Sequence, residues 1–265
     1  MLGYCYAVHA PFKFGLHNIS KATRICMLAH AKAVKAIRKY AKTPPKIGIA
    51  MAAGAFIPKT ESETDIETAK YKSFNSGIGL MNNRWWADPI LLGKPVTAYG
   101  IFKTHEKDMK EIYQPLDFVG LNVYQPYGVS KRDLPENRKT SMGWAIDGRV
   151  LYWTIRFYSE RYGLPVMVTE NGMANDDTVA SDGGVHDKKR IDFMKEYLSG
   201  VKRAVNEGTE VLGYQYWSLM DNFEWALGYK PRFGIIHIDY KTQKRTIKDS
   251  GYFYKEVIKS NGEIN

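Results

Sequence analysis

Pro165-Val166-Met167-Val168-Thr169-Glu170-Asn171-Gly172 is the stretch that decides the fold class. An apolar, largely β-branched run followed by Asn-Gly predicts a buried strand that ends in a turn. Glu170 is therefore expected at the carboxyl end of this strand. In parallel sheets with crossover helices, ligands bind at that end because the loops converge there. Two interpretations of Glu170 stay open at this point, a functional carboxylate or a solvated acid that merely begins a turn.

On both sides of this stretch, the chain alternates between apolar runs and amphipathic segments. The apolar runs predict four buried strands, at residues 46–51, 116–124, 165–170 and 211–217. The amphipathic segments predict helices at residues 18–42, 65–80, 147–162, 187–207 and 246–260. The first of these helices carries an apolar stripe at near-helical spacing, Ile25, Leu28, Ala29, Ala33 and Ile37. The segment Arg84-Trp85-Trp86-Ala87-Asp88-Pro89 is interpreted as a loop braced against the core by its tryptophans.

This alternation predicts an α/β protein with a parallel sheet, and continuous apolar strands fit burial on both faces. A closed (β/α)₈ barrel needs eight strands and about 250 residues, so the length permits a barrel while the strand count does not. The sequence has no internal repeat and no low-complexity linker, so residues 1–265 are expected to form one unit without a domain split.

The composition indicates a globular protein without a nucleic-acid or membrane partner. Of the 265 residues, 44% are hydrophobic and 13% aromatic, which leaves ample material for a core. The net charge is +10, but the lysines are scattered and lack interleaved stacking residues, which favours a solvated basic surface. Cys5 and Cys26 lack metal-type spacing, the start at Met1 lacks a charged region, and no apolar run approaches membrane-spanning length. We therefore expect a soluble cytoplasmic protein in a reducing compartment.

The segment after the fourth strand, Trp217-Ser218-Leu219-Met220-Asp221-Asn222-Phe223-Glu224-Trp225, concentrates aromatic rings and carboxylates. A sugar subsite needs such groups, because a ring face covers the C–H side of a sugar and a carboxylate accepts its hydroxyl protons. Composition alone slightly favours the other interpretation, a buried aromatic cluster.

Several motifs together resemble glycoside hydrolase family 1, the β-glucosidase and β-galactosidase family. They are Thr169-Glu170-Asn171-Gly172, the Trp217–Trp225 segment, Arg232-Phe233-Gly234, His9-Ala10-Pro11, Ala29-His30-Ala31, Trp86-Ala87-Asp88-Pro89, Asp117-Phe118-Val119-Gly120 with Asn122 and Tyr124, and Met142-Gly143-Trp144. They cover essentially the whole chain in the family's order. The resemblance implies a TIM-barrel type fold, of which this chain matches strands five to eight, a half barrel.

The resemblance also implies roles for individual residues. Glu170 would be the nucleophile of a retaining glycosidase and Tyr124 would hydrogen-bond to it, while Asn122 would lie near the sugar 2-hydroxyl. Four further residues would bind the sugar. Trp217 would stack under the sugar ring, and Glu224 would accept hydrogen bonds from its 4- and 6-hydroxyls. Trp225 would reach the 3-hydroxyl, and Phe233 would form part of the wall of the subsite. The pair Glu224-Trp225 favours unphosphorylated glycosides. No cofactor or metal is implied, since a carboxylate pair suffices.

The family's acid/base glutamate lies in an Asn-Glu-Pro motif before the region that this chain matches, and the 265 residues contain no such motif. Asp221 and Asp239 have no matching role. We therefore expect the isolated chain to be weakly active or inactive on ordinary β-glycosides. An N-terminal half barrel or a second copy is expected to pair with the open sheet. The alternatives are a non-catalytic sugar-binding protein and a half barrel whose main interaction is with another polypeptide.

Overall fold

The centre of the molecule is a parallel sheet. The computed structural model describes residues 2–15, 17–75, 82–98, 102–104, 106–130, 132 and 134–263. In this part of the chain four strands pair side by side in the order β1, β4, β5, β6, all in parallel. They are β1 (Gly48–Ala53), β4 (Phe118–Val123), β5 (Val166–Asn171) and β6 (Val211–Tyr216). These are the four strands that the apolar runs predict, and the predicted α/β class with a parallel sheet is confirmed.

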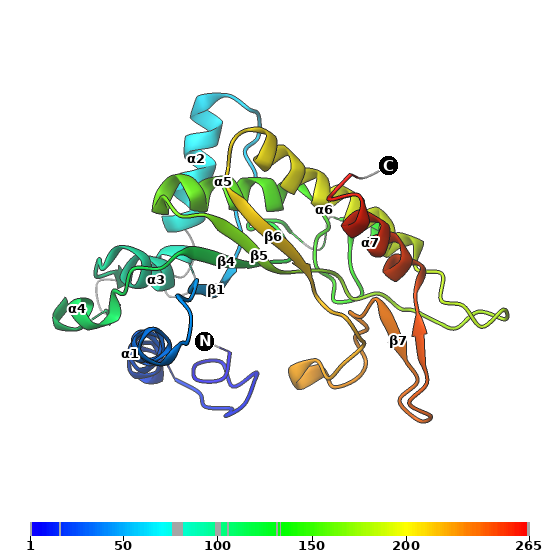
Figure 1. The fold of residues 1–265 in the computed structure, drawn as a ribbon, viewed down its shortest axis with the longest axis horizontal. Helices are drawn as coiled ribbons and strands as arrows, with labels where there is room; N and C mark the ends of the chain where they lie inside the picture. Colours follow the sequence, from blue (N-terminus) through cyan, green and yellow to red (C-terminus); the bar gives the residue numbers. More distant parts are fainter. Residues whose placement is uncertain are drawn as a thin grey trace.

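The described chain contains five longer helices besides the sheet. They are α1 (His17–Tyr40), α2 (Glu63–Asn75), α5 (Arg149–Tyr162), α6 (Lys188–Asn206) and α7 (Asp249–Lys259). Each coincides with a predicted helix, although residues 76–80 of the second prediction lie outside the described residues. Figure 1 shows α5, α6 and α7 on one side of the sheet, and the N-terminal segment and the loop after β6 on the other.

The core lies between the sheet and α5. Val119 and Leu121 of β4 and Val168 of β5 have no exposed surface, and neither have Val150 and Ile155 of α5. Because parallel strands alternate their side chains, this one face of the sheet receives every second residue. The strand that carries Glu170 is therefore anchored by its buried valines.

The other face of the sheet is largely exposed in the described chain. Ala50 and Ala52 of β1 and Gln215 of β6 are exposed on this face. The prediction of strands buried on both faces is therefore wrong for these two strands, which are the outer ones of the sheet. Parallel sheets are normally covered on both faces. The exposed alanines and Gln215 thus mark a surface that an ordinary α/β protein would cover.

The apolar stripe predicted for α1 is not its buried face. Ile25 and Ile37 are exposed, whereas Met27, Ala31 and Val34 are buried. The apolar residues of α1 are distributed around most of its circumference. The 3.6-residue period therefore predicts the helix but not which of its faces is buried.

The prediction of a loop at residues 84–89 is wrong. Helix α3 (Asn83–Ala87) runs into a π-helical turn, η1 (Asp88–Leu92). The Asn82 side chain accepts a hydrogen bond from Trp85 N at 2.9 Å and so caps the helix. Pro89 lies in the first turn of η1, where a missing N–H costs little. The predicted bracing is confirmed, since Trp85 is buried.

The remaining elements are short. The hairpin of β7 (Ile236–Ile238) and β8 (Arg245–Ile247) follows β6, and β2 (Thr97–Ala98) pairs with β3 (Phe102–Lys103). The short helices are η2 (Glu106–Asp108), α4 (Met109–Ile112), η3 (Glu136–Arg138) and η4 (Trp225–Leu227). Among the described helices, none is both long and apolar enough to cross a membrane.

Leu121→Ala is expected to lower the free energy of unfolding by about 2–5 kcal/mol, because it leaves a cavity in a fully buried site. Leu212→Ala is the matched control, since Leu212 lies in the same sheet but is 51% exposed, and it is expected to change stability by about 0.5 kcal/mol or less. Urea unfolding of both variants measures the difference. Equal losses of stability would show that Leu212 is as deeply buried as Leu121, contrary to the structure.

Candidate active site

Glu170 ends β5 beside a tyrosine. The Tyr124 hydroxyl donates a hydrogen bond of 2.6 Å to Glu170 Oε2. Burial raises the pKa of Tyr124 far above its usual value, and the hydrogen bond to Glu170 and the charge of that carboxylate raise it further. The phenol therefore stays protonated at physiological pH and acts as a donor. This pair is the geometry expected for an oriented carboxylate nucleophile.

Asn171 and Gly172 hold the end of β5. The Asn171 side chain donates to Val123 O at 2.7 Å and accepts from the Tyr214 hydroxyl at 2.8 Å. Trp217 N donates to Asn171 O at 2.9 Å. A Cβ atom at Gly172 would collide with the Trp217 carbonyl oxygen, so this position requires glycine. The Asn-Gly pair after Glu170 is thus a close junction between β5 and the segment after β6.

Asn122 lies opposite Glu170 in the register of β4 and β5. Its side-chain oxygen accepts a hydrogen bond of 2.6 Å from the Thr169 hydroxyl. With that oxygen engaged, the amide N–H groups are what Asn122 can offer to a ligand. A hydroxyl oxygen beside Glu170 is a suitable acceptor.

An aromatic wall adjoins this pair. The ring of Phe233 lies 6.3 Å from that of Tyr124, and the ring of Trp144 lies 5.2 Å from Tyr124 and 5.9 Å from Phe233. The motif Met142-Gly143-Trp144 marked Trp144 in the sequence, but no role was predicted for it. A cleft of about 540 Å³ extends from Asn122 and Tyr124 past Trp144, a volume within the range of small-molecule sites.

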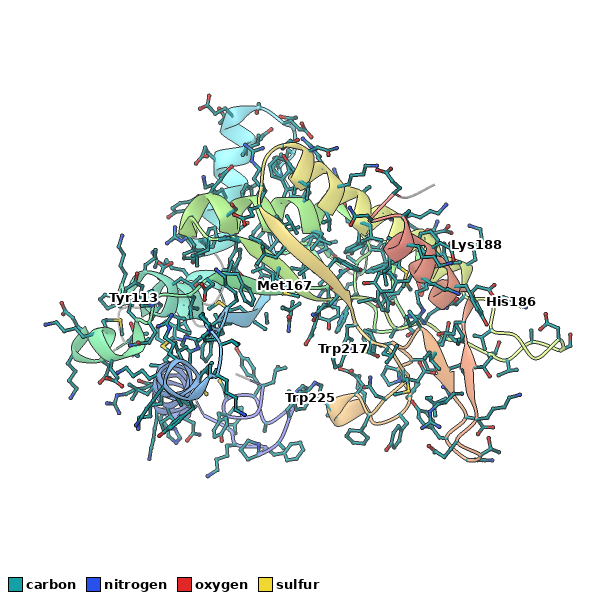
Figure 2. The ribbon with its side chains drawn as sticks, in the orientation of Figure 1. Tyr113, Met167, His186, Lys188, Trp217 and Trp225 are labelled. Atoms are coloured by element: carbon teal, nitrogen blue, oxygen red, sulfur yellow. The ribbon has the colours of Figure 1, made fainter. Side chains whose placement is uncertain are left out.

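The segment after β6 brings a second carboxylate to the site. Glu224 is half-buried, and this burial raises its pKa above the usual value of a glutamate, with a further contribution from the charge of Glu170. The two carboxylates therefore share one electrostatic environment. Trp217 begins this segment and Trp225 begins η4, as Figure 2 shows.

Trp225 has surroundings that the sequence did not predict. Its side chain is 66% exposed, and its ring stacks on His9 with centroids 5.3 Å apart. The structure thus brings Glu170, Tyr124, Asn122, Phe233 and Glu224 together, with Trp217 joined to Asn171 through its backbone. The contact of Trp225 with a sugar stays a prediction.

The other acids considered in the sequence have structural partners. Asp221 is buried and accepts from Arg232 at 2.6 Å and from Lys248 at 2.9 Å. The Asp239 carboxylate accepts from the backbone of Lys241 and Thr242. Neither carboxyl is arranged as a proton donor beside Glu170. Within the described residues, no group of three His, Cys, Asp or Glu side chains could hold a metal ion.

The raised pKa of Glu224 gives a pH prediction. In NMR titrations of ¹³C-labelled carboxyl groups, Glu224 is expected to titrate above the usual range of a glutamate. Glu170→Gln is expected to lower this pKa only in part, because burial is the larger cause of the rise. Glu210→Gln, an exposed change just before β6, is the control and should leave the midpoint in place. If the pKa of Glu224 were the same in Glu170→Gln as in the unsubstituted chain, the charge of Glu170 would have no effect on Glu224, which would contradict this prediction.

The comparisons with known proteins agree with this site. A family model described as "Glycosyl hydrolase family 1" matches residues 1–263. "Beta-glucosidase A" of Thermotoga maritima is 42% identical over 277 residues, covering 99% of this chain and 61% of the relative. "Beta-glucosidase A" of Acetivibrio thermocellus is 37% identical over 283 residues, covering 99% of this chain and 62% of the relative.

Solved structures give the same result. The structure "Family 1 b-glucosidase from Thermotoga maritima" has a TM-score of 0.85 and 39% identity, covering 100% of this chain and 62% of that one. The fold, the carboxylate site and these relatives together define the class as the glycoside hydrolases. Within this class, the chain belongs to glycosyl hydrolase family 1, as the resemblance of its motifs predicted. It spans about 61% of the length of the first relatives it matches.

Proposed function

We propose that these residues are the nucleophile-bearing part of a retaining β-glycosidase and correspond to strands five to eight of a (β/α)₈ barrel. The observation that carries the proposal is the Tyr124 hydroxyl 2.6 Å from Glu170 Oε2 at the carboxyl end of β5. The order of the four parallel strands and the names of the relatives support it.

In the proposed reaction the Glu170 carboxylate attacks the anomeric carbon. A bond forms between that carbon and the carboxylate oxygen while the bond to the leaving oxygen breaks, and a second carboxyl group protonates the leaving oxygen. The same group then deprotonates a water that hydrolyses the glycosyl ester. Tyr124 orients the nucleophile and stays protonated, because burial and the Glu170 charge raise its pKa.

The substrate proposed is an unphosphorylated β-glycoside of the glucose type. Asn122 would donate to the 2-hydroxyl, a contact that strengthens in the transition state. Trp217 would stack on the sugar, Glu224 and Trp225 would bind its remaining hydroxyls, and Phe233 would close the subsite. A carboxylate at Glu224 would repel a 6-phosphate, which supports the choice of unphosphorylated sugars. The complex of the Thermotoga maritima enzyme with glucoimidazole supports sugar binding in this class of site.

The proton donor is proposed to come from outside these 265 residues. They contain no Asn-Glu-Pro motif, and Asp221 and Asp239 are engaged by other groups. The donor would then belong to further residues of the same polypeptide or to a separate chain. A second copy would bring the same residues, so it could cover the sheet without supplying the motif.

The exposed sheet face supports a partner. Ala50 and Ala52 are exposed, and β1 and β6 end the sheet with unpaired edges in the described chain. A groove of about 460 Å³ follows the β6 edge between α6 and α7, where Val201, Val211 and Val257 form part of its wall. An N-terminal half barrel would bury these apolar side chains and pair both edges.

The proposal is tested with 2,4-dinitrophenyl 2-deoxy-2-fluoro-β-glucoside, hereafter the fluoroglucoside. Its leaving group needs little protonation and its fluorine slows release of the sugar, so it reports on the nucleophile without the proton donor. A burst of about one equivalent of dinitrophenolate per folded chain is expected, as for a covalent intermediate that accumulates. Sugar binding without a burst would instead support the non-catalytic sugar-binding alternative.

A further inference from the structure

Six charged side chains form a cluster at the segment that carries most of the proposed sugar-binding residues. Within the described residues they comprise three acids and three bases, Asp177, Asp187, Asp221, Arg190, Arg232 and Lys248. We call this set the buried charge network. All of these side chains except Arg232 are fully buried, and Arg232 is 21% exposed. Buried charges of this kind are tolerated when they are paired and hydrogen-bonded.

Lys248 joins two loops within this network. It lies at the N-terminal cap of α7, and its Nζ donates to Asp177 at 2.5 Å and to Asp221 at 2.9 Å. Asp177 belongs to the loop after β5, the strand that ends near Glu170, and Asp221 belongs to the loop after β6. One ammonium group therefore connects the two loops that border the site.

Arg190 makes a second connection from α6. Its guanidinium pairs with Asp177 and with Asp187, the latter at 2.7 Å. The same group donates to the carbonyl oxygens of Arg232 at 3.1 Å and Phe233 at 3.3 Å. The backbone on either side of the proposed wall residue Phe233 is thus fixed by a buried cation.

Asp221 completes the connection to the sugar-binding segment. It lies four residues after Trp217 and three before Glu224. Its carboxylate also accepts from Gly234 N at 3.0 Å and from Arg232 at 2.6 Å. Through these hydrogen bonds Asp221, near the start of residues 217–234, holds the end of the same segment at Arg232 and Gly234.

We propose that Lys248 and Arg190 are positioning residues that hold residues 217–234 in the geometry needed to bind the sugar. The inference rests on the proposed function, since it assigns this network to the sugar subsite rather than to the reacting carboxylate. Glu170 lies on β5 and Tyr124 just after β4, and the hydrogen bond that joins their side chains involves no member of the network. Arg190 also donates to Met173 O, three residues after Glu170, so the network reaches the backbone of this loop but not the reacting carboxylate. The network thus governs sugar affinity more than the reactivity of Glu170.

The test is the kinetics of the fluoroglucoside reaction, resolved into the inactivator concentration at half-maximal rate (KI) and the limiting rate (kinact). Lys248→Met is expected to raise KI about tenfold while kinact changes by about threefold or less, since displacement of binding groups weakens ground-state contacts. Lys202→Met, on the exposed part of α6 where Lys202 pairs with Glu263, is the matched control and should change neither.

Arg232→Gln is a second variant for the case in which Lys248→Met fails to fold. It removes one cation from Asp221 at the partly exposed edge of the network, and KI is expected to rise by about threefold. An unchanged KI in a folded network variant would overturn the proposal. So would a fall in kinact with KI unchanged, because that result assigns the network to the chemical step.

A third measurement separates this inference from the proposed function. In ¹H–¹⁵N NMR spectra of the unliganded chain, Lys248→Met is expected to move the Trp217 indole resonance and to leave that of Trp153, buried in α5, in place. A wild-type chain that never reacts with the fluoroglucoside contradicts the proposed function, while the NMR result still decides the inference. If the Trp217 indole resonance did not move in Lys248→Met, that result would contradict the inference that Lys248 positions residues 217–234.

Discussion

Glu170→Gln is expected to slow the reaction with the fluoroglucoside by a factor of about 10⁴ or more, the scale of losing a catalytic nucleophile. The amide cannot form the glycosyl ester, and the Tyr124 hydroxyl that now donates to Glu170 at 2.6 Å would face a weaker acceptor. The loss should therefore fall on kinact, with sugar affinity largely retained. Stopped-flow release of dinitrophenolate measures it.

Glu210→Gln is the control for this substitution. Glu210 is an exposed glutamate just before β6, at the opposite end of the sheet from Glu170. The Glu210→Gln variant should react with the fluoroglucoside at the same rate as the unsubstituted chain. A Glu170→Gln variant that keeps the wild-type rate would mean that another group is the nucleophile.

Supplying the proton donor is the second large effect that we expect. The chain alone should react with dinitrophenyl glucosides but scarcely with alkyl glucosides, whose leaving oxygen must be protonated. Addition of the part of Thermotoga maritima beta-glucosidase A that the chain does not match should raise alkyl glucoside hydrolysis by about 10²–10⁴, the range of general acid catalysis. Steady-state release of glucose measures it.

The matched control is the same added polypeptide with glutamine in place of the glutamate of the Asn-Glu-Pro motif, which the family resemblance implies for that part. It should associate with the chain equally well, as light scattering would show, but restore no hydrolysis of alkyl glucosides. Efficient hydrolysis by the chain alone, abolished by Glu170→Gln, would instead mean that an acid/base residue lies within these 265 residues.

The sequence predicts those parts of the fold that depend on local pattern. Long periodic stretches such as α6 and compact apolar runs such as β5 correspond to the observed elements, because each carries its own hydrophobic period. The packed face of α1 could not be predicted, since the choice between Ile25 and Met27 depends on neighbours far along the chain. The sequence does not indicate helix α3, because a proline such as Pro89 suggests a break in helical structure. In the structure Pro89 lies in the first turn of η1, where proline is tolerated.

The candidate site shows the same division. Glu170 could be placed at a strand end from the apolar run before it, and the roles of Tyr124 and Phe233 came from the resemblance of whole motifs. The buried charge network could not be foreseen, because Asp221 and Lys248 are 27 residues apart and resemble ordinary surface charges in the sequence. Their burial is a consequence of tertiary structure. The single unit without a domain split and the cytoplasmic location stay predictions.

The most direct test of the central claim is to identify the residue that carries the sugar. The chain is incubated with the fluoroglucoside, its intact mass is measured, and the protein is digested for peptide mass spectrometry. We predict a single fluoroglucosyl adduct on the peptide containing Glu170, formed by folded chain and suppressed by deoxynojirimycin, a compound found in complex with the Thermotoga maritima relative. An adduct on a different carboxylate, or no adduct on folded chain, would contradict the assignment of Glu170 as the nucleophile.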